Sequence, residues 1–278
     1  MRGTGHAHGA VTVVNAIPAG RGAAFGVGLR TDAVVEIVEE GFEVELASCP
    51  DDDPRLATLC ASRVMEEFGV EGGARISTAS SIPVSRGLKS SSAAANAVIR
   101  ATLDALGETM GDERALLLGT RCAIDAGVSI TGALDDAAAS WFGGLVMTSN
   151  TEGRILARGS MPEGLEVLIH VPNAMLRKRD VPVELMRTMS FVSDMAMDMA
   201  MHGDVYHAMM LNGLYCSSAL GMDTTLMHRA LEEGAFAAGL TGTGPATAII
   251  VAEGESDHMR GIDPEATWIL TEPWEGDA

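Results

Sequence analysis

Three consecutive serines follow a basic residue in the stretch PVSRGLKSSSAAANAV, residues 83–98. They are Ser90, Ser91 and Ser92, and an alanine-rich run of helical character comes directly after them. One serine at the N-cap of that helix would stabilise it by about 1 kcal/mol, so capping accounts for one hydroxyl and leaves two. Free backbone N–H groups at the start of a helix, together with the helix dipole, bind anions. The stretch therefore predicts a phosphate site.

The residues ahead of the serines fit the same kind of site. Gly87 permits close approach of the backbone to an anion, and Lys89 or Arg86 adds positive charge. Serine hydroxyls can donate hydrogen bonds to phosphate or hold Mg²⁺. The Walker A pattern GxxxxGK[ST] is absent, because neither Lys89 nor Lys178 follows a glycine. We therefore expect a phosphate loop of another type.

A second glycine-rich segment, LTGTGP at 240–245, precedes the apolar run TAIIVA. Two glycines around a threonine, followed by a proline, indicate a tight loop with exposed amides. On its own this segment is more typical of a simple turn ahead of a strand.

Two adjacent acids, Asp135 and Asp136, stand in an otherwise uncharged segment of small residues at 131–144. Acidic side chains are rarely fully buried unless they are paired or functional. A helix N-cap ahead of residues 137–140 would explain one of the two. If the pair lies on a strand or extended loop, the two side chains point to opposite sides, so only one of them can face a reacting group.

The composition narrows the class of protein. The chain has 278 residues, and its hydrophobic content of 47% excludes a disordered chain. Its net charge is −19, with only two lysines, which argues against a nucleic-acid partner because the phosphates would be repelled. Four widely spaced cysteines without a CxxC motif are typical of reduced thiols in the cytoplasm. The start lacks an apolar signal segment, and residues 234–252 are uncharged but too rich in glycine for a membrane helix. We expect a soluble cytoplasmic protein with no membrane partner; the sequence leaves its oligomeric state open.

Apolar periodicity predicts interspersed strands and helices. The predicted strands are 10–14, 33–38, 42–47, 74–79, 166–171, 246–252 and 267–271, with hairpins joining 33–38 to 42–47 and spanning 143–158. The predicted helices are 90–106, 112–126, 181–201, 204–220 and 223–237. Regular βαβ alternation is missing, so the fold class is α+β. Four methionines of the second half are predicted to lie in the core: Met189, Met195, Met199 and Met210.

Taken together, the three segments resemble the GHMP small-molecule kinases, whose phosphate loop reads P-x-x-x-G-L-x-S-S-A. The matching residues are Pro83, Gly87, Leu88, Ser90 and Ser91, with Ser92 at the usual alanine. The segment TGTGPA at 241–246 resembles the family's C-terminal glycine loop, and Asp135 before Gly143-Gly144 resembles its acidic segment. The three segments occur in the family's order.

The resemblance implies a two-domain α+β fold, with a ribosomal-protein-S5-like domain over 1–158 and a ferredoxin-like domain over 159–278. It also implies ATP and Mg²⁺, a catalytic role for Asp135, and a metal-contacting role for Ser91. The family usually has a second metal-binding acid upstream; Asp125 is the candidate here, although it could equally be a local helix cap. The nucleotide-binding residues it implies are Pro83, Val84, Ser85, Arg86, Gly87, Leu88, Lys89, Ser90, Ser91, Ser92, Ala93, Thr241, Gly242, Thr243 and Gly244.

Within the family, the chain is most similar to the archaeal type of shikimate kinase. The opening NAIPAGRGAAFG at 15–26, the lysine in GLKSSSA and the second acid at Asp136 carry this resemblance. It implies shikimate as the small-molecule partner. Shikimate is a carboxylate, so a cation should face it. The basic run Arg177, Lys178 and Arg179 could supply that cation, or it could be a solvated loop.

Three alternatives remain at this point. The first is another kinase of the family, such as homoserine kinase. The second is a nucleotide-binding relative that has lost catalysis, which would have no reason to keep Asp135. The third is an unrelated metal-binding protein using His6 and His8, but these are more typical of free histidines near a floppy terminus.

Overall fold

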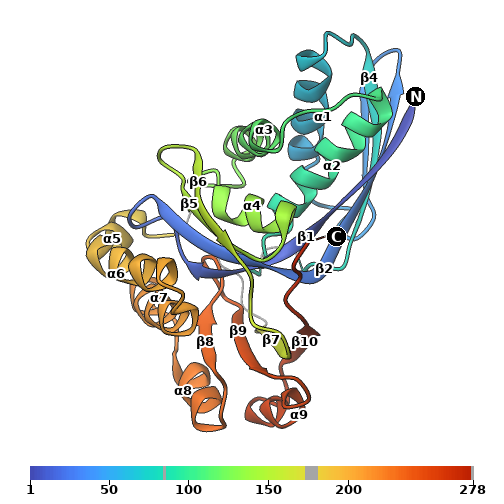
Figure 1. The fold of residues 1–278 in the computed structure, drawn as a ribbon. Coiled ribbons are helices and arrows are strands. Elements are labelled where there is room, and N and C mark those ends of the chain that lie inside the picture. Colours follow the sequence, from blue (N-terminus) through green and yellow to red (C-terminus); the bar gives the residue numbers. More distant parts are fainter. Residues whose placement is uncertain (84–85, 173–180, 277–278) are drawn as a thin grey trace.

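The computed structural model describes residues 1–83, 86–172 and 181–276, and two β-sheets organise it (Figure 1). The first sheet has the strand order β3-β4-β2-β5-β6, with β1 paired to β2. Its strands are β1 (Arg2–Val14), β2 (Arg21–Val38), β3 (Phe42–Leu46), β4 (Gly73–Ser80), β5 (Leu145–Ser149) and β6 (Arg154–Gly159). The second sheet has the order β10-β7-β9-β8. Its strands are β7 (Leu165–Val171), β8 (Ala237–Leu240), β9 (Thr247–Ala252) and β10 (Thr267–Thr271). This mixed arrangement confirms the predicted α+β class.

Helices from the first half of the chain cover one face of the first sheet; helices from the second half lie beside the second sheet, and two of them also contact β1 (Figure 1). Those of the first half are α1 (Arg55–Glu67), α2 (Ser90–Leu106), α3 (Asp112–Asp125) and α4 (Leu134–Phe142). Those of the second half are α5 (Val183–Arg187), α6 (Ser190–Met201), α7 (Val205–Leu220), α8 (Thr225–Glu232), α9 (Ser256–Met259) and the short 3₁₀ helix η2 (Arg260–Ile262). In the described part of the chain, no helix has both the length and the apolar character that crossing a bilayer requires.

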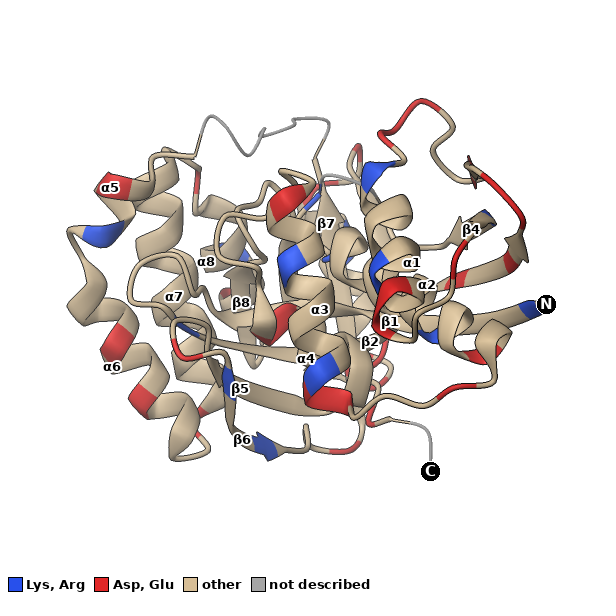
Figure 2. Ribbon diagram, turned by 90° about the horizontal axis from the view of Figure 1, so that it is seen from above, with Lys and Arg blue, Asp and Glu red and all other residues tan. Residues whose placement is uncertain are grey.

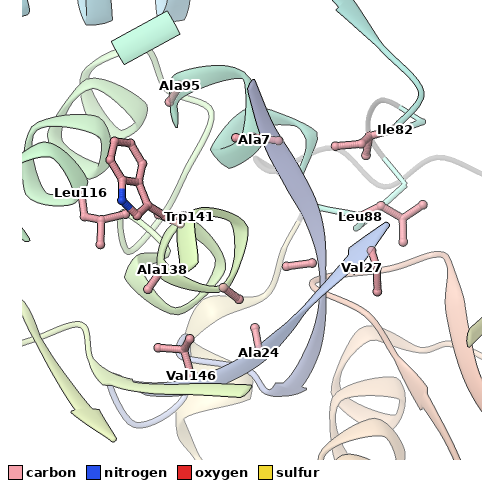
Figure 3. Packing of buried hydrophobic residues seen from close by; sticks show 14 of the residues in the cluster. Ala7, Ala24, Val27, Ile82, Leu88, Ala95, Leu116, Ala138, Trp141 and Val146 are labelled. Atoms are coloured by element: carbon pink, nitrogen blue, oxygen red, sulfur yellow. The ribbon is translucent and has the colours of Figure 1, made fainter. Parts of the chain in front are cut away.

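The burial of β1 and β2 follows from what packs on them. From Ala7 to Val14 every residue of β1 is buried, because α2 and α4 contact this strand and α6 and α7 contact it as well. The first part of β2 is also buried, whereas its end, Ala33–Val38, alternates between buried and solvent-facing residues. In Figure 3 the small side chain of Ala7 lies beside α2 and that of Ala24 beside α4, while Trp141 and Leu116 fill the space next to α4.

The second sheet buries both of its faces, and the two-residue period of a strand separates them. On one face, Leu168 and Ile249 form a small core with α8 and η2. On the other face, Val167, Ile169 and Ile250 join the large core that also contains residues of the first sheet. The large core therefore includes residues from both halves of the chain. The division at residues 158 and 159 stays a prediction.

The last described residues return to the first sheet. Gly28 donates its N–H to the carbonyl of Glu272, and Trp274 donates to the carbonyl of Gly26 at 2.9 Å. The indole of Trp274 stacks on His8, with ring centroids 3.7 Å apart. The expectation that His6 and His8 lie near a floppy terminus is therefore wrong: both belong to β1, and His8 is buried.

Several predicted elements differ from the structure. The expected hairpin between β2 and β3 is wrong, because β4 lies between them and pairs with β3 in parallel. Helix α1 was not predicted, and the expected helix 181–201 is two helices, α5 and α6. Two of the predicted core methionines are exposed, Met189 at 40% and Met195 at 52%.

Surface charge is predominantly acidic, since 38 acidic residues face 19 Lys and Arg. Figure 2 shows Asp and Glu distributed over helices and loops, with fewer basic positions among them. An anion site in such a protein must be built locally, from backbone amides and a small number of cations.

Candidate active site

The two glycine loops predicted from the sequence lie against each other. Gly87 has φ +84°, and a Cβ atom added to it would lie 2.2 Å from the carbonyl oxygen of Thr241. A Cβ on Gly242 would lie 3.2 Å from the carbonyl oxygen of Gly87. Because no side chain separates them, the two loops pack directly against each other. The N–H groups of Thr241, Gly242 and Gly244 are bonded within the protein, so at these positions the second loop does not have the exposed amides that were expected.

A set of hydrogen bonds from the end of β1 holds both loops. Thr241 Oγ1 donates to the carbonyl oxygen of Gly87 at 3.0 Å and accepts from the N–H of Thr12 at 3.2 Å. Thr12 Oγ1 accepts from the N–H of Gly242 at 2.8 Å. Asn15 Nδ2 donates to the carbonyl oxygen of Gly242, also at 2.8 Å. These groups are buried, so the bonds are shielded from water and fix the two loops relative to each other.

The serines lie at the start of α2, as predicted, and line a cavity of about 370 Å³. The predicted residues that line it are Gly87, Lys89, Ser90, Ser91, Ser92, Gly242 and Thr243. The structure thus brings the two glycine loops and the serines to one cavity wall, where free helix N–H groups favour an anion.

Other predicted residues lie behind this wall. Leu88 and Ala93 are buried in the core beneath α2. Gly244 is close to the side chains of Leu240 and Met222, each 2.8 Å from where its Cβ would stand. These residues support the loops and do not line the cavity.

Of the two cations near the phosphate loop, Lys89 lines the cavity. The Arg86 guanidinium donates to the carbonyl oxygen of Pro172 at 2.6 Å. Pro83 is half-buried at the beginning of the loop. The predicted residues Val84 and Ser85 lie outside the described residues, as do the basic residues of the run at 177–179.

The outer part of the cavity comes from residues that carry no motif. They belong to β2, β3, β4 and α1 and the loop before α1, and they are Thr31, Leu46, Ser48, Cys49, Asp52, Asp53, Leu56, Ala57, Thr78 and Ser80. Apolar side chains and hydroxyls dominate this part. Sequence reasoning missed them because each is an isolated strand, helix or loop residue outside any motif.

The two acids lie in the first turn of α4, not on a strand or extended loop, so the expected extended backbone is wrong. Consecutive helical residues point about 100° apart, which still separates the two carboxylates. Asp136 Oδ1 lies 2.8 Å from Nζ of Lys89, and both side chains are at least nine-tenths buried. Asp135 is 3% exposed.

Asp135 accepts a hydrogen bond on Oδ1 from Nδ2 of Asn150 at 2.9 Å. On its other side, Gly22 leaves room for the carboxylate, since a Cβ there would lie 2.6 Å from Oδ2. Burial and the neighbouring charge of Asp136 raise the pKa of Asp135 to about 7, against the opposing influence of Lys89 and Asn150. A carboxyl group with this pKa can take up a proton near neutral pH.

A second, smaller cavity of about 40 Å³ lies beside Asp135. It is lined by the loop after β1, by residues 129–131 and by both acids, and its lining comprises Asn15, Ala16, Ile17, Lys89, Ser129, Ile130, Thr131, Ala133, Asp135, Asp136, Gly242 and Thr243. Asp135 lines only the smaller cavity, whereas six residues line both: Lys89, Ser129, Ala133, Asp136, Gly242 and Thr243. The two cavities therefore meet at the Lys89–Asp136 pair.

Backbone strain accumulates at this junction. Lys89 and Ala133, the residues that precede α2 and α4, have φ values of 65° and 51°. The left-handed conformation costs a non-glycine residue about 1–2 kcal/mol. Strain of this kind persists where the surrounding structure enforces it, and it is concentrated at functional sites.

Asp125 does not join this group. It ends α3, and its carboxylate forms an ion pair with Arg63 of α1. Its side chain is 46% exposed and lines neither cavity. Among the described residues there is also no group of three or more His, Cys, Asp or Glu side chains that could hold a metal by themselves.

Comparisons with known proteins identify relatives of this chain. Residues 55–144 match the family model for the GHMP kinases N terminal domain. The shikimate kinase of Methanothrix thermoacetophila is 42% identical over 96% of this chain and 90% of its own length. That of Methanothermobacter thermautotrophicus is 44% identical over 88% of this chain and 86% of its own.

Solved structures share the fold at low sequence identity. The homoserine kinase from Cytophaga hutchinsonii aligns with a TM-score of 0.76 at 17% identity, covering 98% of this chain and 96% of its own. The mevalonate kinase of Methanococcus jannaschii aligns with a TM-score of 0.71 at 14% identity, covering 98% of each chain. At these identities the likeness concerns the fold.

Proposed function

The chain belongs to the GHMP kinase family, and we propose that it transfers the γ-phosphoryl group of ATP to a hydroxyl of shikimate. One observation carries this proposal. A large cavity walled by helix amides and serine hydroxyls meets a small cavity that contains a buried carboxylate, and Lys89 and Asp136 stand at the junction. Phosphoryl transfer requires this pairing of a phosphate site with an acceptor site, because the two reacting oxygens must lie on opposite sides of the phosphorus.

The larger cavity is assigned to the nucleotide. Its phosphates would lie against the N–H groups at the start of α2 and against the loop at 241–244, with Lys89 supplying positive charge. The apolar and hydroxyl-bearing residues of β2, β3, β4 and α1 would accommodate the base and the sugar. Pro83, Leu88, Ala93, Thr241 and Gly244 support these loops from behind.

Mg²⁺ belongs to the same proposal. The cavity offers the Ser91 hydroxyl as an oxygen donor and no cage of protein ligands among the described residues. This donor set fits Mg²⁺, which keeps several waters and is bound largely through substrate phosphates. When bound, the ion supplies neutralisation of the phosphate charge. Asp125, turned toward Arg63, is not assigned to it.

The chain's own residues would divide the chemistry between them. Asp135 accepts the proton of the acceptor hydroxyl while the alcohol oxygen bonds to the γ-phosphorus and the bond from that phosphorus to the bridging oxygen of ADP breaks. The N–H groups at the start of α2 and the Lys89 ammonium stabilise the charge on the transferring group. The ion pair between Lys89 and Asp136 holds the starts of α2 and α4 in register, so that both substrates are aligned.

Shikimate as the acceptor is supported by the relatives at 42% and 44% identity, whose name is shikimate kinase. The test is an ATP-consumption assay with shikimate, homoserine, mevalonate and galactose. Shikimate should have the highest kcat/KM, by at least about tenfold. A preference for homoserine would overturn the acceptor and leave the kinase assignment standing, whereas no turnover with any alcohol would favour a non-catalytic nucleotide-binding protein.

A further inference from the structure

The turn after β5 brings an amide side chain to the proposed catalytic carboxylate. Asn150 Nδ2 donates to Asp135 Oδ1 at 2.9 Å, and Asn150 Oδ1 accepts from Thr148 Oγ1 at 2.6 Å. The backbone N–H of Asn150 donates to the carbonyl oxygen of Gly20 at 2.8 Å. One residue therefore contacts the carboxylate, the strand behind it and the end of the loop that follows β1.

Thr148 fixes which way the amide points. Its side chain is fully buried, and its single hydroxyl hydrogen is directed to Asn150 Oδ1, since the other acceptor, the carbonyl oxygen of Gly22, is 3.5 Å away. With the oxygen of Asn150 so engaged, its NH₂ group faces Asp135. An amide turned the other way would set its oxygen against the carboxylate of Asp135, which is unfavourable for an ionised acid.

The arrangement restricts Asp135 on two sides. Asn150 occupies Oδ1, and the backbone of Gly22 lies beside Oδ2. The loop that lines the smaller cavity with Asn15, Ala16 and Ile17 ends near Gly20, which Asn150 holds through its backbone. The carboxylate and the acceptor loop are thus connected through a single residue.

We propose that Asn150 is a positioning residue, which orients the carboxylate of Asp135 toward the acceptor hydroxyl and fixes the acceptor loop relative to it. This inference rests on the proposed function, because it takes Asp135 as the proton acceptor. Three groups face that carboxylate: Asp136 on the same helix, Lys89 at the start of α2, and Asn150. Asn150 is the uncharged member, and its N–H bond favours the ionised carboxylate that a base requires.

The test uses the full-length enzyme and single turnovers at saturating ATP and shikimate, so that product release does not obscure the chemical step. Asn150→Ala and Asn150→Asp should each lower the rate at neutral pH by about tenfold to a hundredfold, the worth of a hydrogen bond to a charged group. The acidic limb of the pH–rate profile should move to higher pH by about one unit or more. Asn150→Ala removes the hydrogen-bond donor to the Asp135 carboxylate, and Asn150→Asp places a further negative charge beside it. The KM for ATP should stay unchanged.

Two further variants separate positioning from folding. Thr148→Val keeps the shape of the side chain but removes the hydroxyl that orients the Asn150 amide. It should move the acidic limb of the pH–rate profile to higher pH, as the Asn150 variants do. Thr148→Ser keeps a hydroxyl and should leave the limb where it is in the unmodified enzyme. Glu152→Gln alters an exposed side chain of the same turn, which pairs with Arg154 and not with Asp135, and should behave as the unmodified enzyme. If Asn150→Ala proves unfolded by circular dichroism, Asn150→Asp and Thr148→Val decide the question.

An acidic limb that stays in place in folded Asn150 and Thr148 variants overturns the inference, even if their rates fall. Asp135→Asn, measured in parallel, distinguishes this failure from that of the proposed function. If Asp135→Asn keeps the full rate, the role of Asp135 itself is wrong. If Asp135→Asn lowers the rate but the acidic limb of the pH–rate profile does not move in the Asn150 and Thr148 variants, only the role of Asn150 is wrong.

Discussion

Nζ of Lys89 lies 2.8 Å from Oδ1 of Asp136, and this buried ion pair joins the start of α2 to the start of α4. The two members of the pair act on Asp135 in opposite directions, because the charge of Asp136 raises its pKa and that of Lys89 lowers it. Asp136→Asn should therefore move the acidic limb of kcat to lower pH, and Lys89→Met should move it to higher pH. A pH profile of kcat for both variants checks this. Limbs that shift in the same direction would contradict it.

Asp135→Asn should lower kcat by about 10²–10⁴, the usual worth of general-base help, while ATP still binds. Asp136→Asn should lower it much less, since Asp136 opens on the phosphate side and pairs with Lys89. Steady-state kinetics with both substrates measure the difference. Should Asp136→Asn be the more damaging change, the assignment of the base is wrong.

Asp135→Asn should also change the free energy of unfolding, by an amount that depends on pH. The pKa of Asp135 is about 7 in the folded protein and near 3.8 when it is exposed in the unfolded chain. Ionisation is therefore unfavourable in the folded state, and the free energy of unfolding falls as pH rises between these two values. The free energy of unfolding of Asp135→Asn, relative to that of the unmodified protein, should therefore increase by a few kcal/mol from pH 4 to pH 8. Urea unfolding of both proteins without ATP, at pH 4 and at pH 8, tests this. The prediction is refuted if the difference in unfolding free energy between the two proteins is the same at both pH values.

The segments of the candidate site could be predicted from the sequence because each is a local pattern. Glycines at 87 and 242, the three serines and the acid pair need only neighbouring residues to be noticed. The end of β2, Ala33–Val38, could be predicted for a similar reason, since one face is solvated and its residues alternate. The first part of β2 is buried on both faces and rich in glycine and alanine, so it shows no such alternation.

Contacts between distant segments could not be predicted in this way. Thr12 and Asn150 are isolated polar residues in or beside strands, and their roles appear only when the fold brings them to Gly242 and Asp135. The hairpin expected after β2 is wrong because pairing with β4 is decided by the whole sheet rather than by the turn residues. The exposed Met195 follows from how α6 packs, which periodicity alone does not define.

Gly87→Ala should disrupt both glycine loops. Alanine would meet the carbonyl oxygen of Thr241 at 2.2 Å and would also have to adopt φ +84°. We expect a KM for ATP raised by about tenfold or more and a lower melting temperature. Gly107→Ala is the matched control, because Gly107 has φ +68° with nothing within 4 Å of the added Cβ. It should lose about 1 kcal/mol of stability through the positive φ and leave the KM for ATP unchanged; equal KM values in both variants would contradict the close approach of the loops.

The last prediction concerns the metal and contrasts Ser91 with Asp125. Ser91 lines the larger cavity, which we assign to the nucleotide. Ser91→Ala should therefore raise the Mg²⁺ concentration needed for half-maximal rate at fixed ATP. The activation free energy should rise by at most a few kcal/mol, because the N–H groups at the start of α2 remain. Asp125 pairs with Arg63 outside both cavities. Asp125→Ala should therefore leave the Mg²⁺ dependence unchanged and cost at most about 1 kcal/mol of stability, as expected for a partly exposed ion pair.

A Mg²⁺ titration of the initial rate, with thermal unfolding of both variants, decides between the two residues. Arg63→Ala is the control for the ion pair, because it removes the partner of Asp125 without touching the carboxylate. If Asp125→Ala raised the Mg²⁺ requirement and Arg63→Ala did not, the metal role implied by the family resemblance would hold, and the Asp125 carboxylate would have to leave Arg63 when nucleotide binds. If Asp125→Ala and Arg63→Ala lower stability equally and neither changes the Mg²⁺ requirement, Asp125 serves to join α3 to α1.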